Sequence, residues 1–331
     1  MRTLVLPFEG ETIPEWDRFN NQSPTGTIFT SATWLMALGR IPELSVEIVA
    51  VESDDRWLCG VPLAIRTKGS YRTALPIGAS PYFGIILSPL LDSRSPHGDF
   101  SEVTTLLASE ILKQVHYVEI PNVPSFVIGA RAPEGWEIEE RKTSTRDLRT
   151  TGETESRDKE LRYQLRRAQR ANLSVETPGD PGVFFNLLRD AFKAKHLDLP
   201  LSRAHFMRLF KALNPSSRVS IHLARRGAEV AAGAAILRDA NAYYYWIAAT
   251  NPAFRSTGAS YLLLDQIVRD LHGKGPEVLD LVGANVPSVA RFKAHFASKT
   301  EAYNVLRAHS SRIAKLTRQV YQRVRRVGRR R

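Results

Sequence analysis

Cysteine is almost absent from this 331-residue sequence, which contains Cys59 and no other. An intrachain disulfide is therefore excluded, and a single cysteine fits a reducing compartment. Cys59 lies in the apolar run from Trp57 to Val61, so we expect a buried core residue there and not a nucleophile.

Motifs for metal, nucleotide and nucleophile chemistry are also missing. The eight histidines are scattered, and neither a His-Glu-x-x-His run nor a paired-cysteine spacing occurs. Gly273-Lys274 lacks the remaining residues of a Walker loop, and no double-glycine dinucleotide fingerprint is present. The segment from Gly78 to Tyr82 lacks the second glycine of a nucleophile elbow. These absences favour direct group transfer that uses no metal.

Long apolar runs are lacking as well. The N-terminus has Arg2 but no extended apolar stretch, so no signal peptide is expected. The uncharged stretch 74–91 is interrupted by prolines and glycines, which favours two short strands over a membrane-spanning helix. The expected location is the cytoplasm, either free or peripheral to the inner face of the membrane.

Acidic residues are missing from the end of the chain. No Asp or Glu follows Glu301, whereas ten Lys and Arg residues do, and these ten account for all but two of the formal net charge of +12. The tail 311–331 also carries apolar residues near helical spacing (Ile313, Leu316, Val320, Val324, Val327). This pattern predicts either a basic amphipathic helix for an anionic membrane or RNA, or a last helix docked on the body.

The stretch 242–296 carries the strongest pattern that is present. Residues 242–249 predict a buried strand that is rich in aromatic side chains, and Asn251-Pro252 ends it. A helix follows, with apolar residues at Tyr261, Leu264, Ile267, Val268 and Leu271. The free N–H groups at the start of such a helix bind anions, and Gly258 would let the backbone approach a ligand closely.

This stretch resembles the GNAT acyltransferases, whose pyrophosphate loop reads Gln/Arg-x-x-Gly-x-Gly/Ala. Arg255, Gly258 and Ser260 stand at the three defining places, with Ser as a departure from Gly or Ala. The downstream Arg291-Phe292-Lys293 and the helix with Arg162 to Arg170 resemble the Fem-type (FemABX) peptidyltransferases and their acetyltransferase relatives. The resemblance is best over 157–306.

The resemblance implies an α/β (α+β) fold of two tandem GNAT-like domains, each a mostly antiparallel sheet flanked by helices. The chain agrees, because two helices, three strands in a meander, the anion turn with its helix and one further strand follow one another in 181–282. We expect an N-terminal domain at 1–150, an acyl-donor domain at 156–310 and the basic tail at 311–331.

The resemblance also implies candidate site residues. The donor's phosphates would be held by the turn, which comprises Arg255, Ser256, Thr257, Gly258, Ala259 and Ser260. Lys293 is either a stabiliser of negative charge in the transition state or a surface lysine. Asp280, near Asn285, is either the acceptor of the amine proton or the cap of a neighbouring strand.

Each candidate substrate contact has a structural alternative. Tyr82 and Phe83 either line a cleft or pack on the neighbouring strands. Arg162 and Arg166 form part of a stripe that is either a phosphate clamp or a solvated face. Tyr244 and Tyr245 alternate along their strand, so only one faces the cleft, and Tyr245 is taken with Phe292 as the candidate.

Three functions remain open at this point. The first is an N-acyltransferase that uses acetyl-CoA or another acyl-CoA, with a small-molecule or cell-envelope precursor amine as acceptor. The second is a peptidyltransferase that uses aminoacyl-tRNA and a cell-wall precursor, as the Fem-type enzymes do. The third is an inactive GNAT-like scaffold that binds polyanions through its tail.

Overall fold

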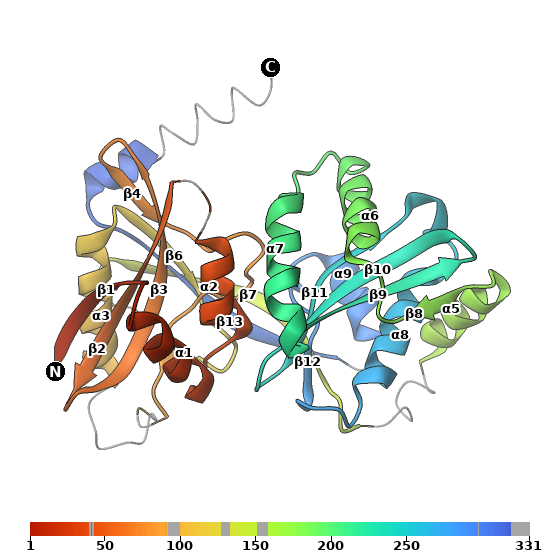
Figure 1. The fold of residues 1–331 in the computed structure, drawn as a ribbon, viewed down its shortest axis with the longest axis horizontal. Coiled ribbons are helices and arrows are strands. Elements are labelled where there is room, and N and C mark those ends of the chain that lie inside the picture. The colour runs from red at the N-terminus through yellow and green to blue at the C-terminus, as the bar shows by residue number, and fades with distance from the viewer. Residues whose placement is uncertain are drawn as a thin grey trace. The chain divides into compact units, whose positions relative to one another are not determined.

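The structure, a computed structural model, describes residues 1–39, 41, 43–89, 91, 100–126, 133–150, 158–296 and 298–318. The chain divides into two compact units. Unit 1 comprises the described residues of 1–140 and 303–318, and unit 2 comprises those of 141–302. The chain passes from one unit to the other within β7 (Trp136–Asp147) and returns within β13 (Lys299–His309) (Figure 1).

These units differ from the expected domains at both boundaries. Residues 305–309 of β13 pair with β6 (Tyr117–Pro121), so the end of this strand lies in unit 1. Residues 145–147 of β7 pair with β12 (Val278–Asp280) and lie in unit 2. Composition along the chain cannot reveal such boundaries, because the pairing strands stand more than 100 residues apart.

Unit 1 is a mixed sheet with helices. Its strand order is β1-β2-β3-β4-β6-β13, and β5 pairs with β3. The other elements of this unit are β1 (Arg2–Pro7), α1 (Thr12–Gln22), η1 (Ile28–Thr30), α2 (Ala32–Leu38), β2 (Leu44–Ser53), β3 (Arg56–Lys68), β4 (Tyr71–Ala74), β5 (Ile86–Leu87) and α3 (Phe100–Gln114).

The core of unit 1 contains the apolar side of α3. Val103, Leu107 and Ile111 recur at helical spacing and are buried against β2, β3 and β6. Cys59 on β3 is part of this core, as predicted, and burial raises the pKa of its thiol to about 12. Trp16 of α1 packs over Gly60 of β3, where an added Cβ would lie 3.0 Å from the indole.

Unit 2 has the element order expected from the sequence, and its strands run in the order β8-β9-β10-β11-β12-β7. The predicted meander is confirmed as three antiparallel strands. The elements are α5 (Lys159–Arg170), β8 (Ser174–Glu176), α6 (Pro181–Lys193), α7 (Arg203–Leu213), η2 (Asn214–Ser216), β9 (Val219–Arg226), β10 (Glu229–Arg238), β11 (Tyr243–Thr250), η3 (Pro252–Phe254), α8 (Ala259–Leu271) and α9 (Pro287–Ala294).

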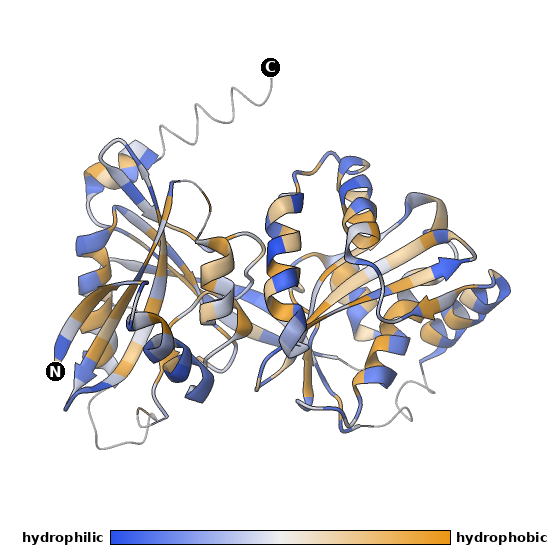
Figure 2. Cartoon of the chain, viewed as in Figure 1, coloured by the Kyte–Doolittle hydropathy of each residue, from blue (hydrophilic) through white to orange (hydrophobic). Residues whose placement is uncertain are grey.

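Helices cover both faces of the sheet of unit 2. Along β10, Ala232, Ala234 and Ile236 pack in one cluster with α8, whereas the ring of Phe184 on α6 lies beside Gly233. This alternation follows from the two-residue period of a strand. In Figure 2, β9 and β10 are largely orange to white and α5 mixes blue with orange, as an amphipathic helix does.

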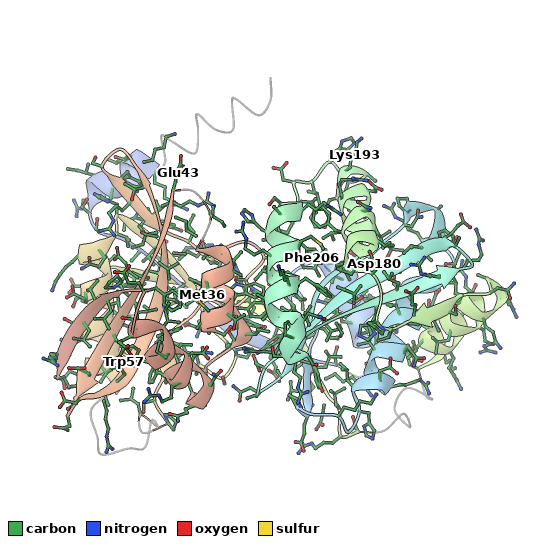
Figure 3. The ribbon with its side chains drawn as sticks, viewed as in Figure 1. Met36, Glu43, Trp57, Asp180, Lys193 and Phe206 are labelled. Carbon is green, nitrogen blue, oxygen red and sulfur yellow. The ribbon has the colours of Figure 1, made fainter. Side chains whose placement is uncertain are left out.

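Local signals in the sequence fix the start of α6. Asp180 accepts a hydrogen bond from Val183 N at 2.7 Å, and Pro181 follows as the first helical residue. Lys193 lies in the last turn, where a cation suits the helix dipole (Figure 3). The neighbouring α7 contributes Phe206, whose ring lies 5.8 Å from that of Phe184 and 6.2 Å from that of Trp246 on β11.

The packing of α8 gives a test of this fold. Leu264 is fully buried in the cluster that joins α8 to the sheet, so Leu264→Ala should cost about 2–5 kcal/mol of unfolding free energy. Leu197 is 56% exposed, and Leu197→Ala should stay within about 0.5 kcal/mol of the parent. Urea unfolding of both variants checks this, and equal losses would contradict the assigned packing.

Candidate active site

Two neighbouring strands of unit 2 separate at the candidate site. β11 and β12 are parallel and pair at two positions, Tyr243 with Leu279 and Tyr244 with Asp280. A cavity of about 670 Å³ is lined by residues that follow on both strands, among them Tyr245, Leu281 and Val282. The cavity therefore opens where the pairing of the two strands ends.

The N-terminus of α8 forms part of the cavity wall. Gly258 caps the helix in a left-handed conformation, with φ of +80°, and the lining includes Arg255, Gly258, Ala259, Ser260 and Tyr261. The N–H groups of a first helical turn have no partner within the helix, and the helix dipole favours negative charge beside them. The Ser260 hydroxyl is 2.7 Å from that of Thr250 on β11, which ties the helix to the strand.

The charged side chains that line the cavity are positive, as is the N-terminal end of the helix dipole. Three cations, Lys195, Arg255 and Lys293, contribute to the wall, and none of the described lining residues is Asp, Glu or His. A cavity with this balance suits an anionic ligand. Within the described part of the chain, no group of three or more His, Cys, Asp and Glu side chains is arranged to hold a metal ion.

Comparisons with known proteins agree with this geometry. Residues 155–294 match the family model described as "Acetyltransferase (GNAT) domain". This match and the arrangement of strands, cavity and helix decide the class of the domain. Unit 2 is a GNAT-type acyltransferase domain. No curated protein matches the sequence.

Solved structures show the same fold over most of the chain. FemX is 12% identical, with a TM-score of 0.66 over 92% of this chain and 97% of that one. The C-terminal domain of a putative lysylphosphatidylglycerol synthetase from Agrobacterium fabrum is 15% identical, with a TM-score of 0.55 over 86% and 89%. A tandem GNAT protein from the clavulanic acid biosynthesis pathway is 12% identical, with a TM-score of 0.53 over 94% and 99%. The predicted α/β fold of tandem GNAT-like domains is thus confirmed.

Lys293 is a buried residue of the GNAT domain and not a surface lysine. Its side chain on α9 lines the cavity, the residue is 4% exposed, and burial lowers its pKa to about 8. Nζ donates to the carbonyl of Val282 at 2.6 Å and to the carbonyl of Gly283. Because an ammonium group has three donors, these bonds leave one for a ligand. Its role in charge stabilisation stays a prediction.

The carbonyls that Lys293 holds belong to a strained turn. Val282 has φ of +53° and Gly283 has φ of +76°, and the left-handed region is rare for a β-branched residue. Asp280 accepts hydrogen bonds from Val282 N at 2.7 Å and from the Thr143 hydroxyl at 2.6 Å. Lys293 and Asp280 therefore hold this turn from two directions, beside the cavity.

These contacts bear on the predicted roles of Asp280 and Asn285. Asp280 is 4% exposed and is not a lining residue of the cavity, so its position favours the structural alternative over that of a base. Asn285 is exposed, and its side-chain oxygen accepts a hydrogen bond from Lys142 N of β7 at 2.9 Å. Asn285 thus joins the loop after β12 to β7 and does not line the cavity.

Only some residues of the turn 255–260 line the cavity, and the others support the turn. Arg255, Gly258, Ala259 and Ser260 line the cavity, whereas Ser256 and Thr257 do not. The Thr257 hydroxyl donates to the carbonyl of Phe254 at 2.7 Å and closes the turn.

Gly258 meets protein backbone on one side. An added Cβ would lie 2.2 Å from the carbonyl oxygen of Gln164 and 3.3 Å from Ala168 N, both on α5. The sequence pattern predicts that this glycine makes room for a ligand. The structure shows that it makes room for α5, so a larger residue here would disturb folding as well as binding.

Other predicted substrate contacts lie away from the cavity. Arg162 and Arg166 are exposed on α5, and neither lines it. Tyr82 and Phe83 belong to unit 1, where they are 1% and 3% exposed, and Tyr82 packs edge-on against Tyr303. Their positions match the alternatives of a solvated face and of core packing. Tyr245 and Phe292 do line the cavity, and burial raises the pKa of the Tyr245 phenol.

The sequence did not reveal Trp246 or Lys195 as lining residues. Both Tyr245 and Trp246 line the cavity although they are consecutive, because β11 has a bulge opposite β10 at this point. A bulge adds a residue to one strand and redirects its side chains. Lys195 comes just after α6, and only the packing of that helix on β11 brings it to the site. No sequence signal marked either residue.

The effect of the contact between Gly258 and α5 on the unfolding free energy can be measured by comparison with a second glycine. Gly258→Ala should cost about 3 kcal/mol of unfolding free energy, since left-handed strain adds to the collision with Gln164. Gly273 has φ of +69° and open space around it, so Gly273→Ala should cost about 1 kcal/mol. Denaturant unfolding separates the two, and equal costs would mean that α5 does not approach Gly258.

The lowered pKa of Lys293 makes stability depend on pH. Below about pH 8 the ammonium is charged in both folded and unfolded chains, and its burial lowers stability. Between pH 8 and 10.5 the folded chain loses this proton first, so the penalty is relieved as pH rises. The unfolding free energy of the parent should therefore rise by a few kcal/mol relative to Lys293→Met across this window. Parallel profiles would show that Lys293 is not buried as described.

Proposed function

We propose that the GNAT domain binds an acyl-CoA, such as acetyl-CoA, and transfers the acyl group directly to an amine. The observation that carries the proposal is the cavity at the split of β11 and β12, which ends on the N-terminus of α8. The N–H groups of this turn and Arg255 would hold the donor's phosphates. The apolar side chains of Tyr245, Leu281 and Phe292 would line the path of its acyl arm.

The transfer has few requirements of the protein. The amine nitrogen attacks the thioester carbon, a C–N bond forms, the C–S bond breaks, and the sulfur leaves with the electron pair. Negative charge develops on the carbonyl oxygen during this attack. The remaining donor of Lys293 is the proposed stabiliser of that charge, because it is desolvated and fixed by two carbonyls.

The described cavity wall contains no carboxylate or imidazole that could accept the amine proton. We propose that the acceptor amine enters the cavity neutral, and that water carries the proton that it loses after attack to the leaving thiolate. Activity should then follow the pKa of the acceptor amine.

The second candidate is transfer from an aminoacyl-tRNA to a cell-wall precursor. The likeness of the fold to FemX across 97% of that chain favours it. The described wall of the donor cavity offers three cations, and these suit either a coenzyme A pyrophosphate or the phosphates at an RNA end. A small-molecule or envelope-precursor amine is the acceptor in both schemes. The exposed side chains of Arg162 and Arg166 would take part only in the second scheme, in which the donor is an RNA.

One substitution separates donor binding from folding. Ser260→Asp places a carboxylate in the first turn of α8, where it favours the helix dipole and repels a phosphate. The thermal midpoint should stay equal or rise, while calorimetric titration with acetyl-CoA should show about a 10- to 100-fold loss of affinity. Ser260→Ala is the matched control, because it removes the hydrogen bond to Thr250 without adding charge.

Equal affinity in Ser260→Asp and Ser260→Ala would place the donor elsewhere. If the parent protein binds charged tRNA and gives no heat with acetyl-CoA, the second candidate replaces the first.

A further inference from the structure

A second cavity lies in unit 1, far along the chain from the anion turn. It has a volume of about 620 Å³ and is formed where β13 leads into residues 312–318, which are helical. In Figure 1 this short helix precedes the grey trace at the C-terminal end. Four of its lining residues are cations, namely Arg307, Arg312, Lys315 and Arg318.

The carboxylates in this wall do not balance its cations. Glu119 accepts a hydrogen bond from Arg307 at 3.2 Å, and Glu137 pairs with Lys315 at 3.0 Å. Arg312 has no ion pair with any residue that the structure describes, and the guanidinium of Arg318 lies over the ring of Tyr117. Arg307 pairs with Glu139 as well, so four cations face three carboxylates, and Arg312 and Arg318 are the two cations without a carboxylate partner among the described residues.

His309 also lines the cavity, and its Nδ1 is buried without a hydrogen-bond partner among the described residues. A buried polar atom of this kind needs a partner, and the described residues do not supply one. Burial lowers the pKa of His309, and the charges of Arg318 and Lys315 lower it further. The cations that line the cavity beside His309 make it suited to an anion.

The helix beside the cavity also exposes apolar side chains. Ile313 is 77% exposed and Leu316 is 61% exposed, and their spacing of three residues places them on one side of the helix. The opposite side is docked, since Ala314 is 3% exposed and its carbonyl accepts a hydrogen bond from the Tyr71 hydroxyl at 2.8 Å. The helix is thus fixed to unit 1 with two aliphatic side chains in water.

We propose that this surface binds an anionic lipid bilayer. The cavity would take a lipid phosphate beside Arg312 and Arg318, while Ile313 and Leu316 enter the interface between headgroups and acyl chains. Nucleic acid would use the cations but would leave these aliphatic side chains in water, so a membrane accounts for both features. The six further arginines after Arg318, with no acid among them, add attraction to an anionic surface.

The experiment compares vesicles of phosphatidylcholine with vesicles that also contain phosphatidylglycerol. The full chain should sediment with the anionic vesicles and not with the neutral ones, and retention should fall as salt is raised. The variant Ile313→Asn/Leu316→Asn should bind the anionic vesicles at least about ten-fold more weakly. The control Met36→Asn changes a 46% exposed residue of α2 in the same unit and should bind as the parent does (Figure 3).

A second pair of variants tests the charge. Arg312→Glu should weaken vesicle binding by about ten-fold or more, because it removes one cation and adds an anion. Arg18→Glu makes the same change at an exposed arginine of α1 and should have a smaller effect. These variants are preferable to truncation after Arg307, which would remove the end of β13 and the buried Ala314.

Two results would overturn the proposal. One is unchanged vesicle binding in Ile313→Asn/Leu316→Asn with circular dichroism that matches the parent. The other is binding to single-stranded polyuridylate that is tighter than to anionic vesicles and insensitive to the same double substitution, which would assign the surface to nucleic acid. The outcome is independent of acyl-donor binding, because the two cavities share no lining residue.

Discussion

The close approach of Gly258 to the backbone of α5 is the constraint on which the rest of the proposed donor site depends. No side chain fits between this residue and the carbonyl oxygen of Gln164, and its left-handed conformation favours glycine on its own account. The contact fixes where α8 begins. The residues of its first turn then line the cavity, and the hydroxyl contact of Ser260 with Thr250 joins that turn to β11. Folding and the proposed anion binding thus use one turn.

The opposite wall is organised by a buried charge. Burial removes water from the ammonium group of Lys293. The carbonyls of Val282 and Gly283 replace only part of this lost hydration, so the pKa of Lys293 falls to about 8. The same bonds stabilise a left-handed conformation that Val282 would otherwise avoid. The Lys293 side chain therefore does two things. It holds the loop after β12, and it keeps one N–H donor beside the point where β11 and β12 separate.

Basic residues form a different kind of surface in each of the two units. In unit 2, cations line a cavity together with a helix N-terminus. In unit 1, cations from β13 and the following helix gather beside exposed aliphatic side chains. The first arrangement suits a discrete phosphate-bearing donor, and the second suits an extended anionic surface. The two proposals together would have the protein bring a soluble donor to an acceptor that is held at a membrane.

The sequence by itself determined the order of elements in unit 2, the turn at Arg255 to Ser260 before α8 and the buried cysteine, because period, caps and glycine placement are local properties of the chain. Lys293 was marked by its position after Arg291 and Phe292, but its burial was not. Tertiary structure alone decided that Asp280 holds a turn, that a bulge brings Trp246 beside Tyr245, and that the end of β13 belongs to unit 1. Each of these depends on strands or helices that are distant in the chain, and no local pattern of residues records which distant backbone a side chain will meet.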